Sequence, residues 1–322
     1  MTRHFLRWCA GLTLALGLAA PAAADTLRIG LITPPGHQWT KSAEALSARL
    51  AAETGGRLDL SVHPAGQLGS EAQMLQQLQT GALDLAFFTV GELAMRDADF
   101  GALLAPYLVA DIAGAQRLLH GPTAQGLLEK ARPMGLEGLG FGLAGMRQVL
   151  LAKPAATGAD LAGRKIRTVP LPQELDFWTK VGATPTPLPL PALYDAMANG
   201  QIDGMQIDYE GVWNSRYFDL GQQMLATDHM IFPSVAVASA RRWAALPEAD
   251  RTLIAGAVRA ELDAMFDAYA AIDADYRARI EGAGFTVTPV GRDFFGTAVD
   301  DWYAEWRVKT PVLLELEAEA AH

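Results

Sequence analysis

Apolar and polar positions repeat with two different periods between residues 25 and 89. Three stretches have the composition and alternation of β-strands: "TLRIGLI" (26–32), "RLDLSVH" (57–63) and "LDLAFFT" (83–89). Between them, residues 37–56 and 69–82 carry apolar side chains at helical spacing, and Ser70 stands where a hydroxyl caps a helix. Strands that alternate with helices predict βαβ units around a parallel sheet.

The same pattern returns further along the chain. Strands are expected over 146–153, 165–169 and 204–207 and around Val235, and helices over 172–183, through Tyr194 and over about 247–282. The last helix has an apolar stripe: Leu253, Val258, Leu262, Met265, Phe266, Tyr269, Ile272, Tyr276 and Ile280. This stripe predicts a core face, with a partner surface as the alternative. Two similar halves indicate two α/β lobes with a ligand cleft between them.

Residues 1–24 have the pattern of a secretory signal peptide. Arg3 and Arg7 flank the start of the apolar stretch "CAGLTLALGLAA", and Ala22 and Ala24 form an A-x-A cleavage signal. The apolar stretch is short for a membrane span, which favours cleavage after Ala24 over an N-terminal anchor. Because Cys9 is the only cysteine, the exported chain has neither a disulfide nor a thiolate metal site.

The composition is that of a globular, acidic protein. With 322 residues, 50% of them hydrophobic and 19% charged, the chain can bury a sizeable core, in about two domains. The net charge is −10, and it becomes −12 without Arg3 and Arg7. An acidic balance of this size argues against nucleic acid as a partner.

Local motifs for catalysis are weak in this sequence. "GFGLAG" places Gly140, Gly142 and Gly145 in a G-x-G-x-x-G pattern, but the strand-like "MRQVLLAK" follows where a dinucleotide site needs a helix. The histidines stand at no ligand spacing, and the sequence contains no P-loop, G-x-S-x-G or H-E-x-x-H. We therefore expect no enzyme, although a secreted enzyme with a discontinuous site would leave no such signature.

Three separated stretches carry a family resemblance: "TGGRLDLSVHPAGQLGSEAQMLQQLQTGALDLAF", "GMRQVLLAKPAATGADLAGRKIRTVP" and "VGATPTPLPLPALYDAMANGQIDGMQ". In this order they resemble the solute-binding proteins of TRAP (tripartite ATP-independent periplasmic) transporters, which take up organic acids. The resemblance implies an α/β, two-lobed periplasmic binding protein of the Venus-flytrap type, with a cleft between the lobes and a long helix in the C-terminal half. We place lobe I at 25–145 plus 232–272 and lobe II at 146–231 plus 273–322.

The resemblance also implies two arginines in the ligand site. Arg167, in "KIRT", matches the arginine that pairs with the ligand carboxylate, and Arg147, in "GMRQ", matches a second arginine common in the family. A guanidinium suits this role because its parallel N–H donors match the two oxygens of a carboxylate. Alternation along the strand puts Ile166 and Arg167 on opposite faces. Structural ion pairs are the alternative for both arginines, whereas Arg164 and Lys165 are expected to be solvated.

Further candidates for the ligand site follow predicted strands or begin helices: Gln38, Trp39, Glu71, Phe88, Thr89, Gln206, Asp208 and Tyr209. For Asp208 three roles stay open: pairing with the ligand, holding a ligand-bridging cation as in some family members, or capping a helix. Otherwise no cofactor is expected. Where the family often has asparagine, this chain has Ile207, which cannot donate a hydrogen bond, so the ligand stays open.

Together these features predict a periplasmic solute-binding subunit that captures a small carboxylate-containing solute by lobe closure. The resemblance implies delivery to TRAP membrane permease subunits, and after signal cleavage the chain itself should not span the membrane. A sensor that presents its bound state to a receptor is the alternative from another class. The number of ligand carboxylates, and monomer against dimer, are left open.

Overall fold

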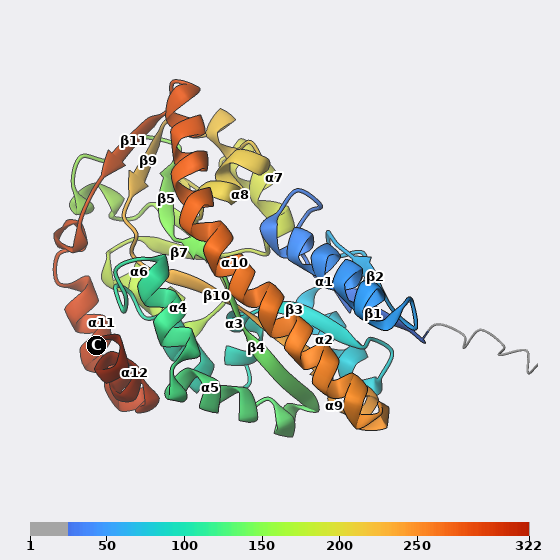
Figure 1. Cartoon of the computed structure of the whole chain (residues 1–322). Coiled ribbons are helices and arrows are strands. Elements are labelled where there is room, and N and C mark those ends of the chain that lie inside the picture. The colour runs from blue at the N-terminus through green and yellow to red at the C-terminus, as the bar shows by residue number, and fades with distance from the viewer. Residues whose placement is uncertain (1–24, 322) are drawn as a thin grey trace, which may run out of the picture.

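Two β-sheets organise residues 25–321, the part of the chain that the computed structural model describes (Figure 1). The predicted signal peptide and its cleavage after Ala24 lie outside the described residues. Sheet A has the strand order β2 (Leu58–His63), β1 (Asp25–Gly30), β3 (Leu85–Thr89), β10 (Ile231–Ser239) and β4 (Leu136–Met146). Sheet B has the order β11 (Thr286–Pro289), β9 (Gln223–Ala226), β5 (Gln148–Leu151), β8 (Gly204–Ile207), β6 (Lys165–Thr168) and β7 (Thr184–Pro187).

Helices connect the strands and cover the sheets. The α-helices are α1 (Gln38–Thr54), α2 (Glu71–Thr80), α3 (Val90–Ala94), α4 (Ile112–His120), α5 (Pro122–Glu129), α6 (Pro172–Lys180), α7 (Leu193–Ala198), α8 (Tyr209–Asn214), α9 (Ala240–Ala245), α10 (Glu248–Gly282), α11 (Ala298–Lys309) and α12 (Val312–Ala320). Short 3₁₀ helices are η1 (Ala98–Leu104), η2 (Arg132–Met134), η3 (Gly158–Leu161), η4 (Leu190–Ala192), η5 (Tyr217–Asp219) and η6 (Arg292–Phe295). Ser70 caps α2 as predicted: its hydroxyl accepts from the N–H of Gln73, whose side chain accepts from the N–H of Ser70.

The prediction of parallel sheets is wrong in part. β1 pairs in parallel with β2 and β3, and β6 with β7 and β8, as the βαβ pattern requires. However, β10 runs antiparallel to both β3 and β4, and β5 runs antiparallel to both β8 and β9. The reason is that β10 and β5 come from distant parts of the chain and enter each sheet in the opposite direction, which a reading of neighbouring elements cannot detect.

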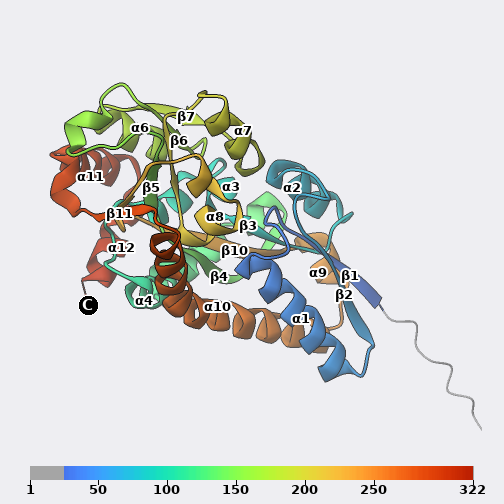
Figure 2. The same cartoon turned by 90° about the horizontal axis from the view of Figure 1, so that it is seen from above.

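Helix α10 confirms the predicted long helix and its core face. It crosses the whole molecule and lies beside α1 in both views (Figures 1 and 2). Most of its stripe is fully buried, including Leu262, Met265 and Tyr269. The "GFGLAG" glycines lie in β4, where a Cβ at Gly140 would come within 2.8 Å of Leu262 and one at Gly142 within 2.8 Å of Met265. These glycines therefore allow β4 to pack closely against α10.

Both faces of sheet B are buried at its central strand β5. Val149 and Leu151 of β5 belong to the large hydrophobic core that also fills the space around sheet A, whereas Leu150, between them, belongs to a separate core with Met205 and Met224. This division follows from the alternation of side chains along a strand.

The C-terminal helices contact elements of both halves. α11 packs against α6, while α12 packs against α4, α5 and η1, and the N–H of Thr123 donates to Glu319 over 3.0 Å. The lobe boundaries stay a prediction; they assign α12 to lobe II and its neighbours α4 and α5 to lobe I.

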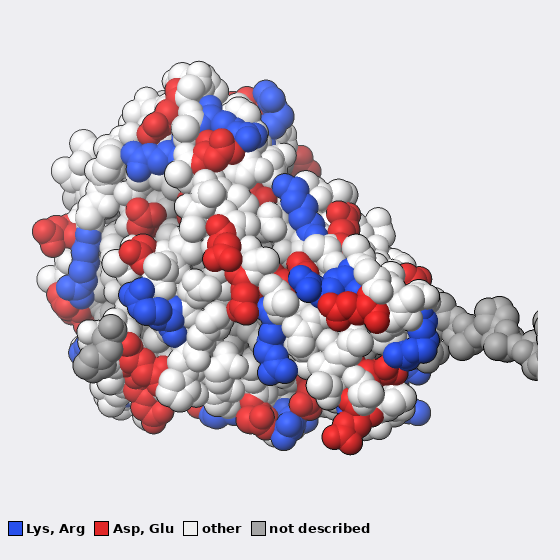
Figure 3. Space-filling view, viewed as in Figure 1, with Lys and Arg blue, Asp and Glu red and all other residues white. Residues whose placement is uncertain are grey.

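Charged side chains are dispersed on the molecular face of Figure 3, where lysine and arginine alternate with acidic residues and form no large basic patch. Among the described residues, no helix combines the length and the apolar content needed to cross a bilayer.

Candidate functional site

Arg167 is a buried arginine on β6, between β8 and the edge strand β7 of sheet B. Its side chain lies opposite Ile166, which joins the core, and its Nε donates to the carbonyl oxygen of Leu188 over 2.9 Å. Among residues 25–321, no carboxylate forms an ion pair with its guanidinium. Burial, followed by the positive charge of Arg147, lowers the pKa of Arg167 to about 9. The terminal nitrogens of this guanidinium thus remain available to an anion.

Arg147 has a partner from the protein itself. It stands between β4 and β5, and its Nη1 lies 2.6 Å from Oδ2 of Asp208, while its guanidinium covers the ring of Phe232 at 3.6 Å. Asp208 is also the N-cap of α8, since its Oδ1 accepts from the N–H of Gly211 over 2.6 Å. The capping role considered for Asp208 is therefore confirmed, and Arg147 forms the structural ion pair that was the alternative to ligand binding. The Arg164 side chain donates to the carbonyls of Lys153 and Pro154.

Gln206 organises a buried polar network beside the arginines. Its Nε2 donates to the hydroxyl of Thr168 over 2.7 Å and to Glu174, and its Oε1 lies 3.2 Å from both Trp178 Nε1 and His229 Nε2. Burial raises the pKa of Glu174 to about 7 and lowers that of His229 to about 3. Because Gln206 Oε1 can only accept, Nε2 of His229 carries a proton, and the lowered pKa keeps the imidazole neutral near pH 7.

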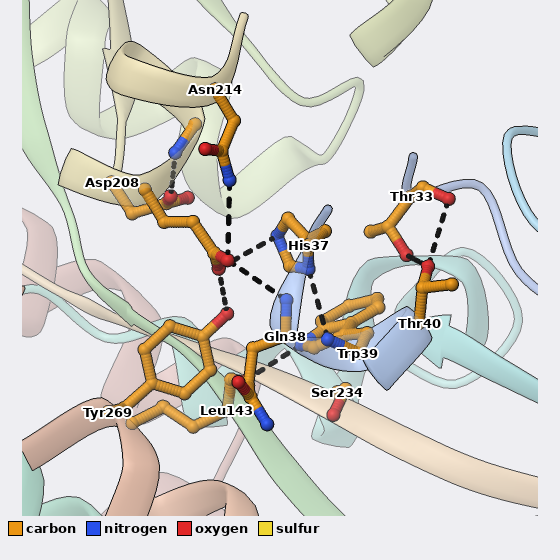
Figure 4. A network of polar contacts seen from close by, with 12 residues as sticks. Thr33, His37, Gln38, Trp39, Thr40, Leu143, Asp208, Asn214, Ser234 and Tyr269 are labelled. Atoms are coloured by element: carbon orange, nitrogen blue, oxygen red, sulfur yellow. Dashed lines mark hydrogen bonds and ion pairs between the residues drawn. The ribbon is translucent and has the colours of Figure 1, made fainter. Parts of the chain in front are cut away.

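A second network joins α8 to the start of α1 (Figure 4). The carboxylate of Glu210 accepts from the backbone N–H of Gln38 over 2.9 Å and from the hydroxyl of Tyr269 over 2.6 Å. His37 Nε2 lies 3.5 Å from its Oε2, and Asn214 Nδ2 lies 3.5 Å from its Oε1. Glu210 is fully buried, and this burial raises its pKa.

His37, Asp208 and Glu210 are the group that could hold a cation, since one donor atom of each lies within 4.8 Å of the others. The donors around them argue against it: Arg147 and Gly211 occupy both oxygens of Asp208, and His37 Nδ1 already accepts from the N–H of Trp39. A cation bound beside Arg147 would be repelled by the positive charge of its guanidinium. The ligand-bridging cation considered from the sequence does not fit these residues.

The remaining candidates from the sequence lie in three other places: the hydrophobic core, a hydrogen-bonded pair, and helix α8. Trp39 is core, with its Nε1 donating to the carbonyl of Leu143 over 2.8 Å, and Phe88 is fully buried in β3. Glu71 accepts from both the N–H and the hydroxyl of Thr89, and burial raises its pKa to about 8. Within residues 25–321, no hydrogen bond or ion pair joins this pair to the arginines. Tyr209 is buried in α8, and in the described part of the chain its hydroxyl has no hydrogen-bond partner.

Sequence reasoning missed Glu174, Glu210, His229 and Asp273. Each is isolated in the sequence and becomes part of the site only through the fold. Asp273, on α10, accepts from the N–H of Met146 through Oδ2, and burial raises its pKa to about 7. Its Oδ1 and the Oε1 of Glu174 are buried acceptors that have no hydrogen-bond partner among the described residues. Buried polar atoms of this kind point to a missing donor.

Comparison with known proteins identifies the family. Residues 29–309 match the model of bacterial extracellular solute-binding protein, family 7. The chain belongs to this family. It is 25% identical to the sialic acid-binding periplasmic protein SiaP of Vibrio cholerae over 95% of this chain and 96% of that protein. It is 28% identical to the 2,3-diketo-L-gulonate-binding periplasmic protein YiaO of Escherichia coli over 76% of each chain.

Solved structures agree with this assignment. A TRAP periplasmic solute-binding protein of Xanthobacter autotrophicus with bound β-D-galacturonate is similar at a TM-score of 0.85, with 25% identity over 91% of this chain and 98% of that chain. A Bradyrhizobium relative in complex with D-galacturonate gives a TM-score of 0.86, with 26% identity over 92% of this chain and all of the other. The two-lobed binding-protein fold and the TRAP resemblance expected from the sequence are confirmed, and the relatives are periplasmic solute-binding proteins.

Proposed function

We propose that this family 7 protein captures a hydroxylated monocarboxylate, such as a sugar acid, and that Arg167 holds its carboxylate. The observation that carries the proposal is the burial of Arg167 without a carboxylate partner. Taking a charge out of water costs several kcal/mol unless an opposite charge and hydrogen bonds offset it. A ligand carboxylate supplies both, through two parallel N–H···O bonds.

The surroundings of Arg167 support one ligand carboxylate rather than two. Arg147 is already neutralised by Asp208 at 2.6 Å, so it carries no unpaired positive charge for a second anion. By contrast, Glu174 and Asp273 each have a buried oxygen that receives no hydrogen bond from residues 25–321. Ligand hydroxyl groups are donors of the required kind. The solutes named for the relatives, sialic acid, diketogulonate and galacturonate, support the same class.

Capture would occur in the periplasm, without turnover of the solute, and the loaded protein would then dock on the membrane permease subunits of a TRAP system. Family membership supports this sequence of events. Incubation of the protein with a bound sugar acid should return the acid unchanged.

The test is a thermal-shift and calorimetric titration of residues 25–322 with D-galacturonate, D-gluconate and neutral D-galactose. The two acids should raise the melting temperature by a few degrees near a hundredfold excess over their Kd, whereas galactose should not. Arg167→Ala should abolish the shift, and Arg167→Lys should weaken it because a lysine lacks the bidentate fork.

Arg164→Ala is the matched control. It removes a positive charge three positions from Arg167, from a side chain that donates to the carbonyls of Lys153 and Pro154. Its titration should match wild type. Equal binding of galacturonate by wild type and a folded Arg167→Ala variant would show that Arg167 is structural.

A further inference from the structure

Glu174 is a fully buried carboxyl group for which the protein supplies hydrogen bonds but no ion pair. It lies in the first turn of α6 and is 2% exposed. Its Oε2 accepts from the hydroxyl of Thr168 over 3.0 Å and from the side-chain amide of Gln206. Both donors are neutral, and Oε1 receives no hydrogen bond from residues 25–321. A buried carboxylate without a cation beside it tends toward its neutral form.

Two arginines act against this tendency. Burial raises the pKa of Glu174 to about 7, while the two hydrogen bonds and the charges of Arg147 and Arg167 act to lower it. In return, burial lowers the pKa of each arginine, and the charge of Glu174 counteracts this. Glu174 therefore belongs to the same electrostatic cluster as Arg167, and near neutral pH it is balanced between its charged and neutral forms.

The other charged groups on α6 and on the elements packed against it form neither a hydrogen bond nor an ion pair with Glu174. Lys180, for example, links Asp176 at 2.6 Å to Glu305 at 2.7 Å. His229 reaches Glu174 through Gln206 and is neutral near pH 7. These other charged groups are Lys165 on β6, Asp176 and Lys180 on α6, Asp300, Asp301, Glu305, Arg307 and Lys309 on α11, and Asp97 and Asp99 at η1.

A solute carboxylate on Arg167 would change the charge balance at Glu174. Because Asp208 already pairs with Arg147, the charge of Arg167 is the one that an ionised Glu174 offsets. A second anion would leave two negative charges for this one positive charge, in a buried place where like charges repel strongly. Protonation of Glu174 removes the repulsion. Since Oε2 already accepts two hydrogen bonds, the proton belongs on Oε1.

We propose that the protein binds its acid together with a proton, which comes from the surrounding water and is held on Oε1 of Glu174. The inference rests on the proposed function, because it requires a solute carboxylate on Arg167. It deepens that function by naming a second species in the site: one acid anion and up to one proton bind together. The protonated Oε1 can donate to a solute hydroxyl, whose oxygen accepts a hydrogen bond as well as donating one.

Proton uptake makes the affinity depend on pH with a defined sign. Below its pKa of about 7, Glu174 is already neutral, so the Kd should not change with pH. Above pH 7 each binding event has to take up a proton, and the Kd should rise by up to about tenfold per pH unit. The Kd for D-galacturonate should therefore be about tenfold higher at pH 8 than at pH 6.

The experiment counts protons by isothermal titration calorimetry. D-Galacturonate is titrated into residues 25–322 at about pH 7.5, in phosphate and in Tris, whose ionisation enthalpies differ. Because the acid itself is ionised at this pH, the dependence of the binding enthalpy on the buffer gives the protons taken up by the protein. Wild type should take up more than about half a proton, since at least half of Glu174 is ionised before binding. Glu174→Gln should take up none, and its Kd should be the same at pH 6 and pH 8.

Asp176→Asn is the matched control. Asp176 is a carboxylate on the same helix, two positions further on, but it pairs with Lys180 at 2.6 Å and accepts from Trp306 over 2.8 Å. The proton uptake and the pH dependence of this variant should match wild type.

Thr168→Val tests the proton site even if circular dichroism shows that Glu174→Gln is not folded. It removes the hydroxyl that donates to Oε2 and keeps the shape of the side chain. Loss of a donor to the charged form raises the pKa of Glu174 further. The rise of the Kd should then begin at a higher pH than in wild type, and an unchanged onset would contradict a proton on Glu174.

The outcomes separate the proton site from the carboxylate anchor. Binding of galacturonate without proton uptake, or equal uptake by wild type and folded Glu174→Gln, would overturn the proton site and leave Arg167 as the anchor. Uptake that is lost in Asp273→Asn but kept in Glu174→Gln would place the proton on Asp273, the carboxyl group of α10 whose pKa is also about 7. If wild type bound neither galacturonate nor gluconate, the proposed function would fail, and the proton site with it.

Discussion

Arg147 and Asp208 form an ion pair in which both side chains are about 95% buried, with 2.6 Å between Nη1 and Oδ2. The face of the Arg147 guanidinium lies on the ring of Phe232, and its Nε has no hydrogen-bond partner within residues 25–321. The pair therefore divides the two buried arginines into different roles. Arg147 is neutralised inside the protein, and the unpaired charge of the site is concentrated on Arg167.

Asp208→Asn should lower the free energy of unfolding by about 3 kcal/mol, because removal of one partner leaves a buried charge without compensation. Asparagine can still cap α8, so the loss reports mainly on the ion pair. Urea denaturation measures the change. The same variant should bind dicarboxylates better relative to monocarboxylates, since Arg147 becomes available.

Asp219→Asn is the control for that experiment. Asp219 pairs with Arg216 at 2.8 Å, but both side chains are substantially exposed. Exposed pairs contribute little, so this variant should change the stability by less than about 1 kcal/mol. Equal losses of unfolding free energy for the two variants would mean that the buried Arg147–Asp208 pair stabilises the protein no more than the exposed Arg216–Asp219 pair.

His229 should make the protein less stable as the pH falls. Burial, followed by the charge of Arg147, lowers its pKa to about 3, whereas an unfolded histidine has a pKa near 6.5. Below pH 6.5 the unfolded chain takes up a proton that the folded chain does not. Stability is therefore fully present above about pH 6.5 and is lost toward pH 3, by up to about 1.4 kcal/mol per pH unit.

The comparison of wild type with His229→Gln isolates this effect. Glutamine cannot be protonated in this range, so the difference in unfolding free energy between the two proteins should shrink as the pH falls from 6.5 to 4. Glu174 and Asp273 have pKa values raised to about 7, so the stability that they contribute is lost as the pH rises toward 7. This opposite effect is present in both proteins and does not alter the difference between them. Parallel stability curves would contradict a neutral His229.

The fold was predictable where local patterns decide it. The cap of α2 by Ser70 and the apolar stripe of α10 depend on residues a few positions apart, and both predictions were correct. The direction of β10 was not predictable from such patterns, because its partners β3 and β4 lie far away in the sequence. The site divides similarly: Arg167 lies in a recognisable segment, whereas Glu210 is 172 positions from Gln38.

Leu262 tests the core face of α10. It is 2% exposed and lies against Gly140 and Gly142 of β4. Leu262→Ala should cost about 3 kcal/mol, from lost apolar burial and the cavity that remains. Leu314→Ala, at a position that is 53% exposed, should change the unfolding free energy by less than about 0.5 kcal/mol in the same urea titration. Similar costs at both positions would mean that this face of α10 is not packed as described.

Gly145 lies where the chain leaves sheet A for sheet B, and its backbone requires a residue without a side chain. Its φ is +67°, and a Cβ there would lie 2.7 Å from Oδ1 of Asp273, the carboxylate that accepts from the N–H of Met146. Gly145→Ala should therefore lower the free energy of unfolding by at least about 2 kcal/mol, from backbone strain and displacement of Asp273.

Gly163→Ala separates the two causes, because Gly163 has a φ of +72° but nothing within 4 Å of a Cβ. It should cost only about 1 kcal/mol, for the backbone alone. Hydrogen exchange at the amide of Met146 should accelerate in Gly145→Ala and not in Gly163→Ala. Unchanged exchange in both variants would mean that Asp273 can move without losing its hydrogen bond to the N–H of Met146.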